Sequence, residues 1–210
     1  MVSVLSTCWR AILEVLFPSC CAACGRKLVQ GEQVVCSSCI ASIVRTEHAS
    51  LCDNGIDMLF ADWMRKERRH VHYEHGAAFA YYNRARGHVL RQMIERGKFG
   101  MWPNPQVFFE LGCLAAKEFV GSELFEDLDL LVPIALHPRR LRERGFNQAE
   151  YICQGLHKIT HIPIDNTHLI RVRNNVHQSR SAFQDRRDNV RDLFLVQHPE
   201  EWKGKHILLV

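Results

Sequence analysis

Two pairs of cysteines near the N-terminus have the residue type and the spacing of a metal site. Cys21 and Cys24 form one C-x-x-C pair, and Cys36 and Cys39 form a second pair after eleven intervening residues. The short x-x turn lets both sulfurs of a pair point the same way, and zinc accepts four thiolates in a tetrahedron at about 2.3 Å. Since four sulfurs leave no open coordination position, we expect a structural Zn²⁺ that holds the fold and performs no chemistry.

Other interpretations of the cysteines stay open. Cys20 is a possible substitute ligand, although only Cys21 has the two-residue spacing to Cys24. The four thiols could instead be buried without metal, or one pair could be redox-active. Neither pair opens a helix after an apolar strand, which disfavours the redox alternative. The isolated cysteines are expected to have ordinary core or surface roles: Cys8, Cys52, Cys113 and Cys153.

Arginine is concentrated in two segments that follow apolar stretches predicted to be strands. One is a polar loop over residues 136–148, and the other begins at residue 171 and continues to residue 191. Guanidinium groups bind phosphate oxygens in pairs, and a helix starting at Asn147 would add backbone N–H donors. The pattern therefore predicts an anion site for pyrophosphate or a nucleic-acid backbone. A solvated charged face is the alternative.

Hydrophobic spacing places these segments in an α/β chain. The run over residues 128–136 is continuously apolar, as in a strand buried on both faces. Asn147, with Glu150 three residues later, has the pattern of a helix N-cap. Strands alternating with helices indicate a mainly parallel sheet, with ligands bound at the carboxyl edge. The predicted strands span residues 76–83, 128–136, 168–172, 192–196 and 206–210, and helices are predicted over residues 1–17, 88–99 and 105–120 and from Asn147.

Length and composition limit the class of protein. The 210 residues are 47% hydrophobic and 24% charged, which is typical of a folded protein and excludes a disordered or collagen-like chain. The net charge of +4 is too small to indicate nucleic-acid binding without local clusters. No apolar run reaches the roughly 18 residues of a membrane span, and the first 17 residues lack signal-peptide features. We expect a cytoplasmic protein.

Three regions are expected along the chain. Residues 1–44 would form an amphipathic helix and a Cys₄ ribbon of the double zinc ribbon type, and residues 45–75 a solvated linker. Residues 76–210 would form the α/β domain. In the linker, His70, His72 and His75 are possible ligands, but they have no carboxylate or cysteine at matching spacing.

Three stretches carry a family resemblance: LFPSCCAACG, VPIALHPRRLRERGFNQAE and RVRNNVHQSRSAFQDRRDNVRDLF. The chain resembles the ComF/ComFC competence-protein family, in which a zinc ribbon precedes a type I phosphoribosyltransferase-like (amidophosphoribosyltransferase-like) domain. The resemblance implies a role in DNA uptake or nucleotide salvage, with phosphoribosyl pyrophosphate (PRPP) and Mg²⁺ as ligands in the complete protein. It further implies a flexible catalytic loop from Arg171 to Phe194. The residues implied for pyrophosphate or anion binding are Arg140, Arg144, Asn147, Arg171, Arg173, Gln178, Arg186 and Asn189.

The chain also departs from the family pattern. Asn175 and Ser181 stand where relatives commonly have Thr and Leu, and relatives continue the ILLV strand into an acidic pair and a Thr-Thr-Gly loop. That loop holds the sugar phosphate, and the acidic pair helps to place Mg²⁺. We therefore expect the domain to be incomplete at the C-terminus and phosphoribosyl transfer by these 210 residues to be impaired, and pyrophosphate release from PRPP would contradict this expectation.

Two alternatives belong to other functional classes. One is a non-catalytic zinc-ribbon module that binds single-stranded DNA through the arginine segments. The other is a scaffold that docks a DNA-uptake helicase. The anion-site prediction requires both arginine segments to converge on one side of the α/β domain.

Overall fold

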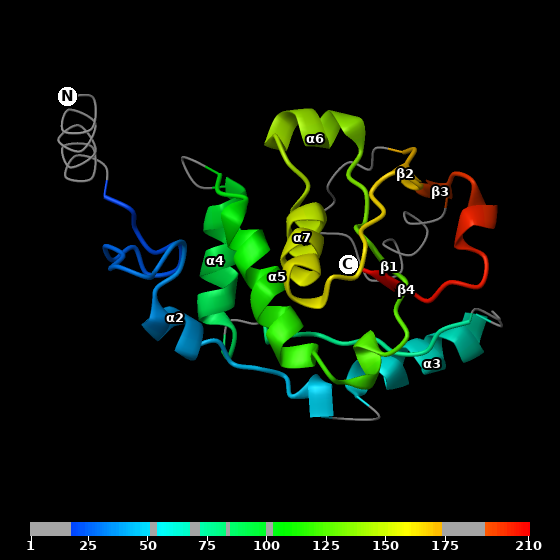
Figure 1. Cartoon of the computed structure of the whole chain (residues 1–210), viewed down its shortest axis with the longest axis horizontal. Helices are drawn as coiled ribbons and strands as arrows, with labels where there is room; N and C mark the ends of the chain where they lie inside the picture. The colour runs from blue at the N-terminus through cyan, green and yellow to red at the C-terminus, as the bar shows by residue number, and fades with distance from the viewer. Residues whose placement is uncertain (1–17, 51–53, 68–71, 83–84, 100–102, 174–191) are drawn as a thin grey trace. The chain divides into compact units, whose positions relative to one another are not determined.

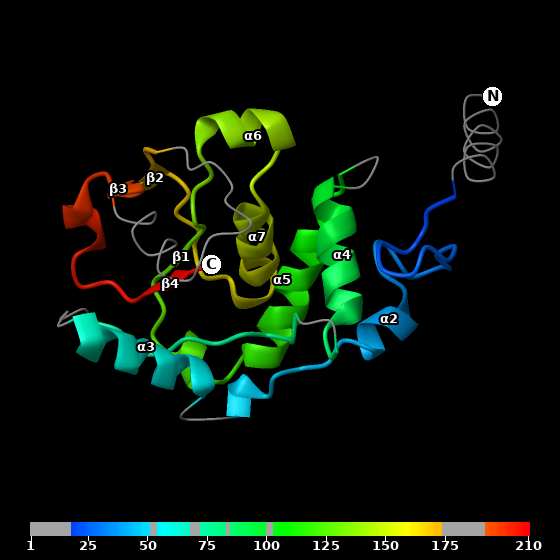
Figure 2. The same ribbon diagram turned by 180° about the vertical axis from the view of Figure 1, so that it is seen from behind.

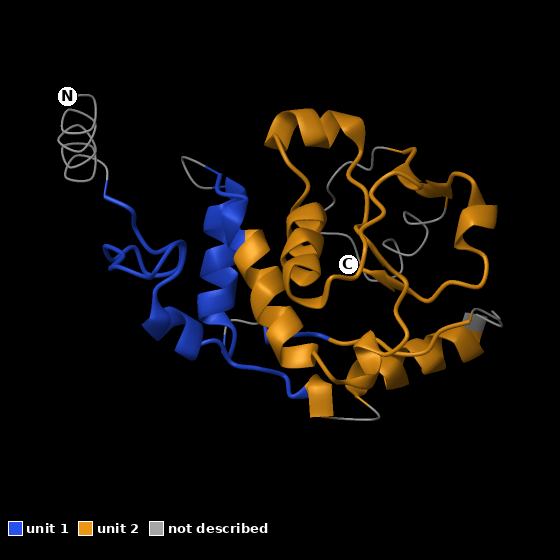
Figure 3. Cartoon of the chain, in the orientation of Figure 1, with its two compact units in different colours: residues 1–47, 78–107 blue, residues 48–77, 108–210 orange. Residues whose placement is uncertain are grey.

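The computed structural model describes residues 18–50, 54–67, 72–82, 85–99, 103–173 and 192–210. The chain divides into two compact units (Figure 3): unit 1 comprises residues 1–47 and 78–107, and unit 2 comprises residues 48–77 and 108–210. Neither unit is continuous in sequence. The helix expected over residues 1–17 lies outside the described residues.

The described elements are shown in Figure 1. Unit 1 contains α2 (Ser37–Ala41), α4 (His88–Phe99) and the start of α5 (Gln106–Phe119). Unit 2 contains the rest of α5 and also η1 (His48–Ser50), α3 (Gly55–Glu67), η2 (Glu123–Phe125), β1 (Leu130–Val132), α6 (Pro138–Arg144), α7 (Gln148–Thr160), β2 (Leu169–Arg171), β3 (Phe194–Val196), η3 (Pro199–Trp202) and β4 (Ile207–Leu209). In the described residues, no helix is both long enough and apolar enough to cross a membrane.

Unit 1 combines a cysteine-rich turn region with the amphipathic helix α4. Helix α4 spans the predicted residues 88–99 and buries a set of side chains at helical spacing: Val89, Leu90, Met93 and Gly97. The strand expected over residues 76–83 is present only as an antiparallel bridge between Arg45 and Ala80. The Arg45 guanidinium lies 4.1 Å from the centre of the Phe79 ring, a cation–π contact that holds the bridge.

Unit 2 contains two small sheets. Strand β1 pairs in parallel with β4, with Leu131 opposite Leu208, and its other edge forms a parallel bridge to Ile164. Strand β2 pairs with β3 in antiparallel orientation. Leu131 and Val132 are completely buried, as the continuous apolar run predicts.

The prediction of a mainly parallel sheet therefore needs correction. The described residues form a mixed α/β structure with one parallel and one antiparallel pair, and they do not show the broad sheet of a phosphoribosyltransferase. Strands β2 and β3 run in opposite directions, with Phe194 opposite Arg171. Short apolar runs identify strands but carry no information about their direction.

The segment assigned above to a linker contains an ordered helix. Asn54 caps α3, because its side-chain oxygen accepts hydrogen bonds from the backbone N–H groups of Ile56 and Asp57. The Asp57 carboxylate in turn accepts from the Tyr73 hydroxyl at 2.6 Å and from the Gly76 N–H at 2.7 Å. These bonds tie Tyr73 and Gly76 to the start of α3, so the described part of this polar segment is not a simple linker.

Helices α5 and α7 cross at two glycines. A Cβ atom on Gly112 would collide with the Ile152 carbonyl oxygen, and one on Gly155 would collide with the Phe109 carbonyl oxygen. The two backbones therefore approach more closely than any larger residue would permit. Beside the crossing, Ala116, Leu131, Cys153 and Leu156 form a buried apolar cluster. This packing fixes α7, whose N-terminus lies beside the arginine segment.

The β2–β3 pair and η3 lie side by side in both views (Figures 1 and 2) and are joined through Asp165. Its Oδ2 accepts a hydrogen bond from Trp202 Nε1 at 2.7 Å and lies 2.6 Å from His168 Nδ1. Burial raises the pKa of Asp165, but hydrogen bonds from Trp202, Thr167 and His168 outweigh it, so its pKa is lowered.

This network predicts an acid-sensitive contribution to stability. Because the pKa of Asp165 is lowered in the folded state, its stabilisation is present above the ordinary carboxyl pKa of about 4 and is lost as the pH falls below it. Asp165→Asn should reduce the difference in unfolding free energy between pH 7 and pH 3, measured by urea denaturation. Asp127→Asn, at an exposed turn, is the control and should leave that difference unchanged. Equal pH dependence in the wild type and Asp165→Asn would contradict this prediction.

Candidate metal centre and arginine cluster

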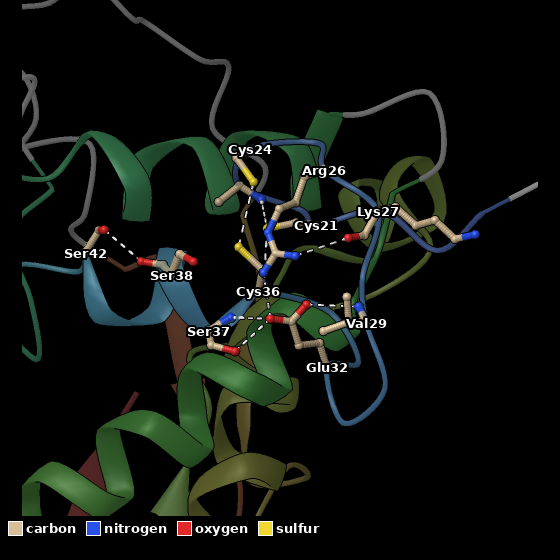
Figure 4. Close-up of polar contacts among 11 residues, drawn as sticks. Cys21, Cys24, Arg26, Lys27, Val29, Glu32, Cys36, Ser37, Ser38 and Ser42 are labelled. Atoms are coloured by element: carbon tan, nitrogen blue, oxygen red, sulfur yellow. Dashed lines mark hydrogen bonds and ion pairs between the residues drawn. The ribbon is translucent and has the colours of Figure 1, made fainter.

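The four predicted ligands come together in unit 1. The Sγ atoms of Cys21, Cys24, Cys36 and Cys39 all lie within 4.8 Å of one another. The Cys24 and Cys36 sulfurs are 3.8 Å apart (Figure 4), which matches the edge of about 3.8 Å in a ZnS₄ tetrahedron with 2.3 Å bonds. Cys20 is exposed, and its sulfur donates to the Pro18 carbonyl instead. The donor set and its geometry therefore fit a closed four-sulfur metal site.

Backbone groups prepare these sulfurs for a cation. The N–H groups of Ala23 and Cys36 donate to Cys21 Sγ at 3.4 and 3.3 Å, a pattern that favours a thiolate. Burial raises the pKa of Cys21, but backbone hydrogen bonds outweigh it and lower this pKa to about 6. Burial and the neighbouring thiols raise the pKa of Cys39. A bound dication would let all four sulfurs ionise together.

A single carboxylate holds the turn between the two cysteine pairs. Glu32 accepts hydrogen bonds from the Ser37 hydroxyl and N–H, from the Val29 N–H and from the Arg26 guanidinium (Figure 4). The hydrogen bonds from Ser37 and Val29, with the charge of Arg26, lower the pKa of Glu32 to about 2. Since Ser37 follows Cys36 directly, this carboxylate helps to place the second cysteine pair.

The first arginine segment is a helix, which corrects the predicted loop. His137 caps α6 by accepting from the Arg139 N–H, and Pro138 occupies the first helical position. An ion pair of 3.1 Å joins Arg139 and Glu143 one turn apart. Gly145 ends the helix at a φ of 84°, where a residue with a side chain would be strained. The charged composition suggested a loop, while the capping residues favour a helix.

The predicted N-cap of α7 is confirmed. Asn147 is buried, and its side-chain oxygen accepts from the Ala149 N–H at 3.2 Å. The Asn147 side-chain amide donates to Glu150 at 3.3 Å and to the Ile134 carbonyl at 3.1 Å. Asn147 therefore ties the start of α7 to the chain just beyond β1. These hydrogen bonds give Asn147 a structural role at the start of α7.

The charge of Arg140 acts on one arginine of each segment within unit 2. Burial and the positive charge of Arg140 lower the pKa of Arg144. Burial and the same Arg140 charge lower the pKa of Arg171, which stands at the end of β2. The Arg140 guanidinium thus repels one arginine of its own helix α6 and one arginine at the end of β2. A polyanion would relieve this repulsion.

The remaining candidates of the second segment divide into two groups. Arg173 is exposed, and its carbonyl accepts a 3.3 Å hydrogen bond from Arg171 Nε. The Arg171 guanidinium also lies 5.6 Å from the centre of the Phe194 ring. Three predicted positions lie outside the described residues: Gln178, Arg186 and Asn189.

A cavity in unit 2 was not anticipated from the sequence. Its volume is about 200 Å³, and its walls come from η1, the start of α3, residues 75–77 and residues 121–124. His75 lies between two acids there, with Nδ1 3.9 Å from Asp57 Oδ2 and Nε2 3.7 Å from Glu123 Oε2. The two acids approach different ring nitrogens, so these groups do not converge on one metal position. His72 is exposed, and His70 lies outside the described residues.

Two of the four isolated cysteines are described, and both lie in the core, one of the two roles expected for them. Cys113 and Cys153 are buried, and burial raises the pKa of both thiols, to about 12 for Cys153. They are core residues of α5 and α7. Cys8 and Cys52 lie outside the described residues.

Comparison with known proteins gives a distant and partial match. The chain is 30% identical over 100 residues to the DNA utilization protein YhgH of Escherichia coli O157:H7, and to the same protein of E. coli strain K12. The match covers 48% of this chain and 42% of each relative, so this chain spans less than half the length of the proteins it matches. A 29% match of the same extent is found in Shigella flexneri. No protein-family model and no solved structure matches the chain significantly.

Proposed function

We propose that this chain is a DNA-utilization protein in which a structural zinc ribbon accompanies a phosphate-binding α/β body. The ribbon corresponds to residues 1–44 and the body to residues 76–210. The relatives' printed name supports the DNA-related role. The four clustered thiols support zinc and a reducing, cytoplasmic location, because disulfide formation would destroy the site.

The phosphate-binding role rests on one observation above all. The charge of Arg140 acts on both Arg144 and Arg171, although these residues come from different segments. Partly buried guanidinium groups repel one another, and a bound anion offsets this repulsion. Bidentate hydrogen bonds between guanidinium groups and phosphate oxygens would offset the repulsion among the arginines and stabilise the bound anion.

The proposed ligand is phosphoribosyl pyrophosphate or a related nucleotide sugar. Support for it comes from the resemblance to competence-family phosphoribosyltransferases, in which Arg140, Arg144 and Asn147 correspond to the pyrophosphate side of the pocket. Mg²⁺ would accompany this ligand in the complete protein and neutralise its pyrophosphate. In the described part of the chain, the four cysteines are the one close group of three or more metal-ligating side chains, so we assign no step to Mg²⁺.

Single-stranded DNA is a second candidate ligand, favoured by the same guanidinium groups and by the relatives' name. Stacking of bases on aromatic side chains would strengthen DNA binding. However, Phe146 is only 8% exposed, and the Arg171 guanidinium lies over the Phe194 ring. The compact anion is favoured because the Arg140 charge acts on arginines of both segments, while Phe146 is buried and Phe194 lies against Arg171.

The test compares ligands on the full 210-residue chain by isothermal titration calorimetry. Inorganic pyrophosphate and PRPP with Mg²⁺ should bind, and Arg140→Met and Arg171→Met should each weaken binding about tenfold, the effect of one charge-assisted contact. Arg139→Met is the matched control, because Arg139 belongs to the same helix but pairs with Glu143 at the surface. Tight binding of an oligothymidine with no binding of pyrophosphate would favour the DNA candidate. Equal losses in Arg139→Met and Arg140→Met would overturn the site.

A further inference from the structure

Helix α6 begins at a histidine whose side chain accepts a hydrogen bond from the first turn. The backbone N–H of Arg139 donates to His137 Nδ1 at 3.2 Å. The first N–H groups of a helix have no partner within the helix, so the N-cap side chain supplies an acceptor. Pro138 occupies the first helical position and has no N–H group, so this bond satisfies the first N–H donor of α6.

The direction of this hydrogen bond fixes the charge state of the ring. A ring nitrogen accepts a hydrogen bond only when it carries no proton, so the cap requires a neutral His137 with its proton on Nε2. A protonated imidazole donates at both nitrogens and accepts at neither. The usual N-cap residues keep an acceptor oxygen in mild acid, whereas an imidazole gains its proton between about pH 8 and about pH 5. The cap of α6 therefore depends on pH in a range in which ordinary caps do not.

The charged groups around His137 do not compensate a positive ring. The first turn of α6 contains no acid, and Arg140 stands at the third helical position, where a capping box has Glu or Gln. The acid of the next turn, Glu143, pairs with Arg139. Arg171 of β2 is a further cation, close enough for the Arg140 charge to act on it. In the part of the chain that the structure describes, His137 makes no ion pair with a carboxylate. Protonation would thus remove the acceptor and add a cation at the positive end of the helix.

A histidine of the next helix has the opposite arrangement. His157 Nδ1 lies 2.8 Å from the Ile162 carbonyl oxygen. A carbonyl oxygen only accepts, so Nδ1 of His157 carries a proton in both charge states, and protonation leaves this contact in place. His157 also stands in the last turn of α7, where the negative end of the helix favours a cation. The last turn of α7 is therefore an internal reference for the effect of acid on α6.

We infer that His137 is a pH-dependent positioning residue of α6: its neutral ring caps the helix, and its protonation releases the first turn, which carries Arg140. The inference concerns α6 itself and requires no ligand. Its consequence, an arginine segment that loses order in mild acid, bears on anion binding only through the proposed phosphate-binding function.

NMR spectroscopy of the full chain tests the cap directly. At about pH 8, the imidazole ¹⁵N signals of His137 should show a proton on Nε2 and none on Nδ1. As the pH is lowered to about 5.5, the backbone ¹³C shifts of residues 138–141 should move toward unfolded values in step with His137 protonation. The loss of one N-cap corresponds to about a fivefold decrease in the helix-to-coil equilibrium constant. The shifts of the last turn of α7 should stay constant, and carboxylates stay ionised over this range.

Three substitutions separate capping from a general effect of acid. His137→Asn keeps an acceptor oxygen throughout this range, so α6 should be equally helical in mild acid and at the higher pH. His137→Ala removes the acceptor, so α6 should already be less helical at the higher pH and should change little on acidification. His157→Asn is the matched control, because it removes a histidine that does not cap α6, and it should leave the acid response of α6 as in the wild type.

The outcomes distinguish this inference from the proposed function. Constant α6 shifts in the wild type would overturn the capping role, and so would an equal acid response in His137→Asn. A His137→Ala protein whose α6 is as helical as that of the wild type at the higher pH would overturn it as well. These measurements use no ligand, so their failure does not touch the anion site. Absence of pyrophosphate binding, in contrast, would refute the anion site and leave the capping role intact.

Discussion

Removal of the metal is expected to unfold the cysteine-rich region of unit 1 while unit 2 stays folded. The apolar core of this region is small, with Ala23, Val35 and Ile43 as its main buried residues besides the cysteines. A core of this size does not stabilise a fold without a metal or disulfides. Structural zinc contributes about 10 kcal/mol or more to the folding of small ribbons, so its loss should abolish their structure.

Hydrogen exchange measured by mass spectrometry provides the check. After treatment with a strong chelator, peptides from residues 18–43 should lose protection, while peptides from α7 and β1 should keep it. The purified chain should contain one zinc per molecule by elemental analysis. Protection of residues 18–43 that is unaffected by complete zinc removal would contradict a structural role.

Single substitutions distinguish the ligands from their neighbour. Cys21→Ala should abolish stoichiometric zinc binding, because three sulfurs leave the tetrahedron open. Cys20→Ala is the matched control and should retain one zinc, since the Cys20 sulfur is exposed and bonds to Pro18. Loss of zinc in Cys20→Ala with retention in Cys21→Ala would show that the ligand assignment is shifted by one residue.

Replacement of Gly155 by Ala is expected to cause the largest loss of stability in unit 2. Its new Cβ would overlap the Phe109 carbonyl oxygen and lie 2.7 Å from the Cys113 nitrogen. Backbone atoms of α5 cannot rotate away as a flexible side chain would, so the two helices must separate. We expect a loss of about 3 kcal/mol in the free energy of unfolding, at the upper end for overpacking.

Urea denaturation followed by tryptophan fluorescence measures this effect, and Trp63 and Trp202 both belong to unit 2. Gly55→Ala is the matched control, because a Cβ there meets no atom within 4 Å and α3 gains a better helix former. It should leave stability unchanged or slightly raised. A Gly155→Ala protein as stable as the wild type would show that the helices do not cross this closely.

The helix crossing matters for function as well as for stability. Helix α7 begins at Gln148, which accepts a hydrogen bond from Arg144, and carries Asn147 at its N-cap. A displaced α7 would move these side chains relative to Arg140 and Arg171. Gly155→Ala should therefore also weaken pyrophosphate binding, although Gly155 lies two turns beyond the start of α7.

The local features of this protein could be predicted from its sequence. The two C-x-x-C pairs predicted the cluster of four sulfurs, because a two-residue turn between cysteines largely fixes where their sulfurs point. The helices over residues 88–99 and 106–119 and the Asn147 cap followed from apolar spacing and side-chain chemistry within one or two turns. In each case, the interacting residues are close in the chain.

Features that join distant segments were decided only by the tertiary structure. The antiparallel pairing of β2 with β3 depends on how the chain returns after residue 171, which apolar spacing does not encode. The Gly112–Gly155 crossing joins residues more than forty positions apart, and neither glycine has a local turn to explain it. The hydrogen bond between Arg144 and Gln148 joins residues four apart, a spacing that is visible in the sequence. The electrostatic effect of Arg140 on Arg171 joins two segments and could not be predicted from the sequence. Side-chain chemistry and spacing thus determined the metal cluster and the helix caps. Long-range packing decided which arginine charges act on one another, because the positions of distant segments depend on the whole buried core.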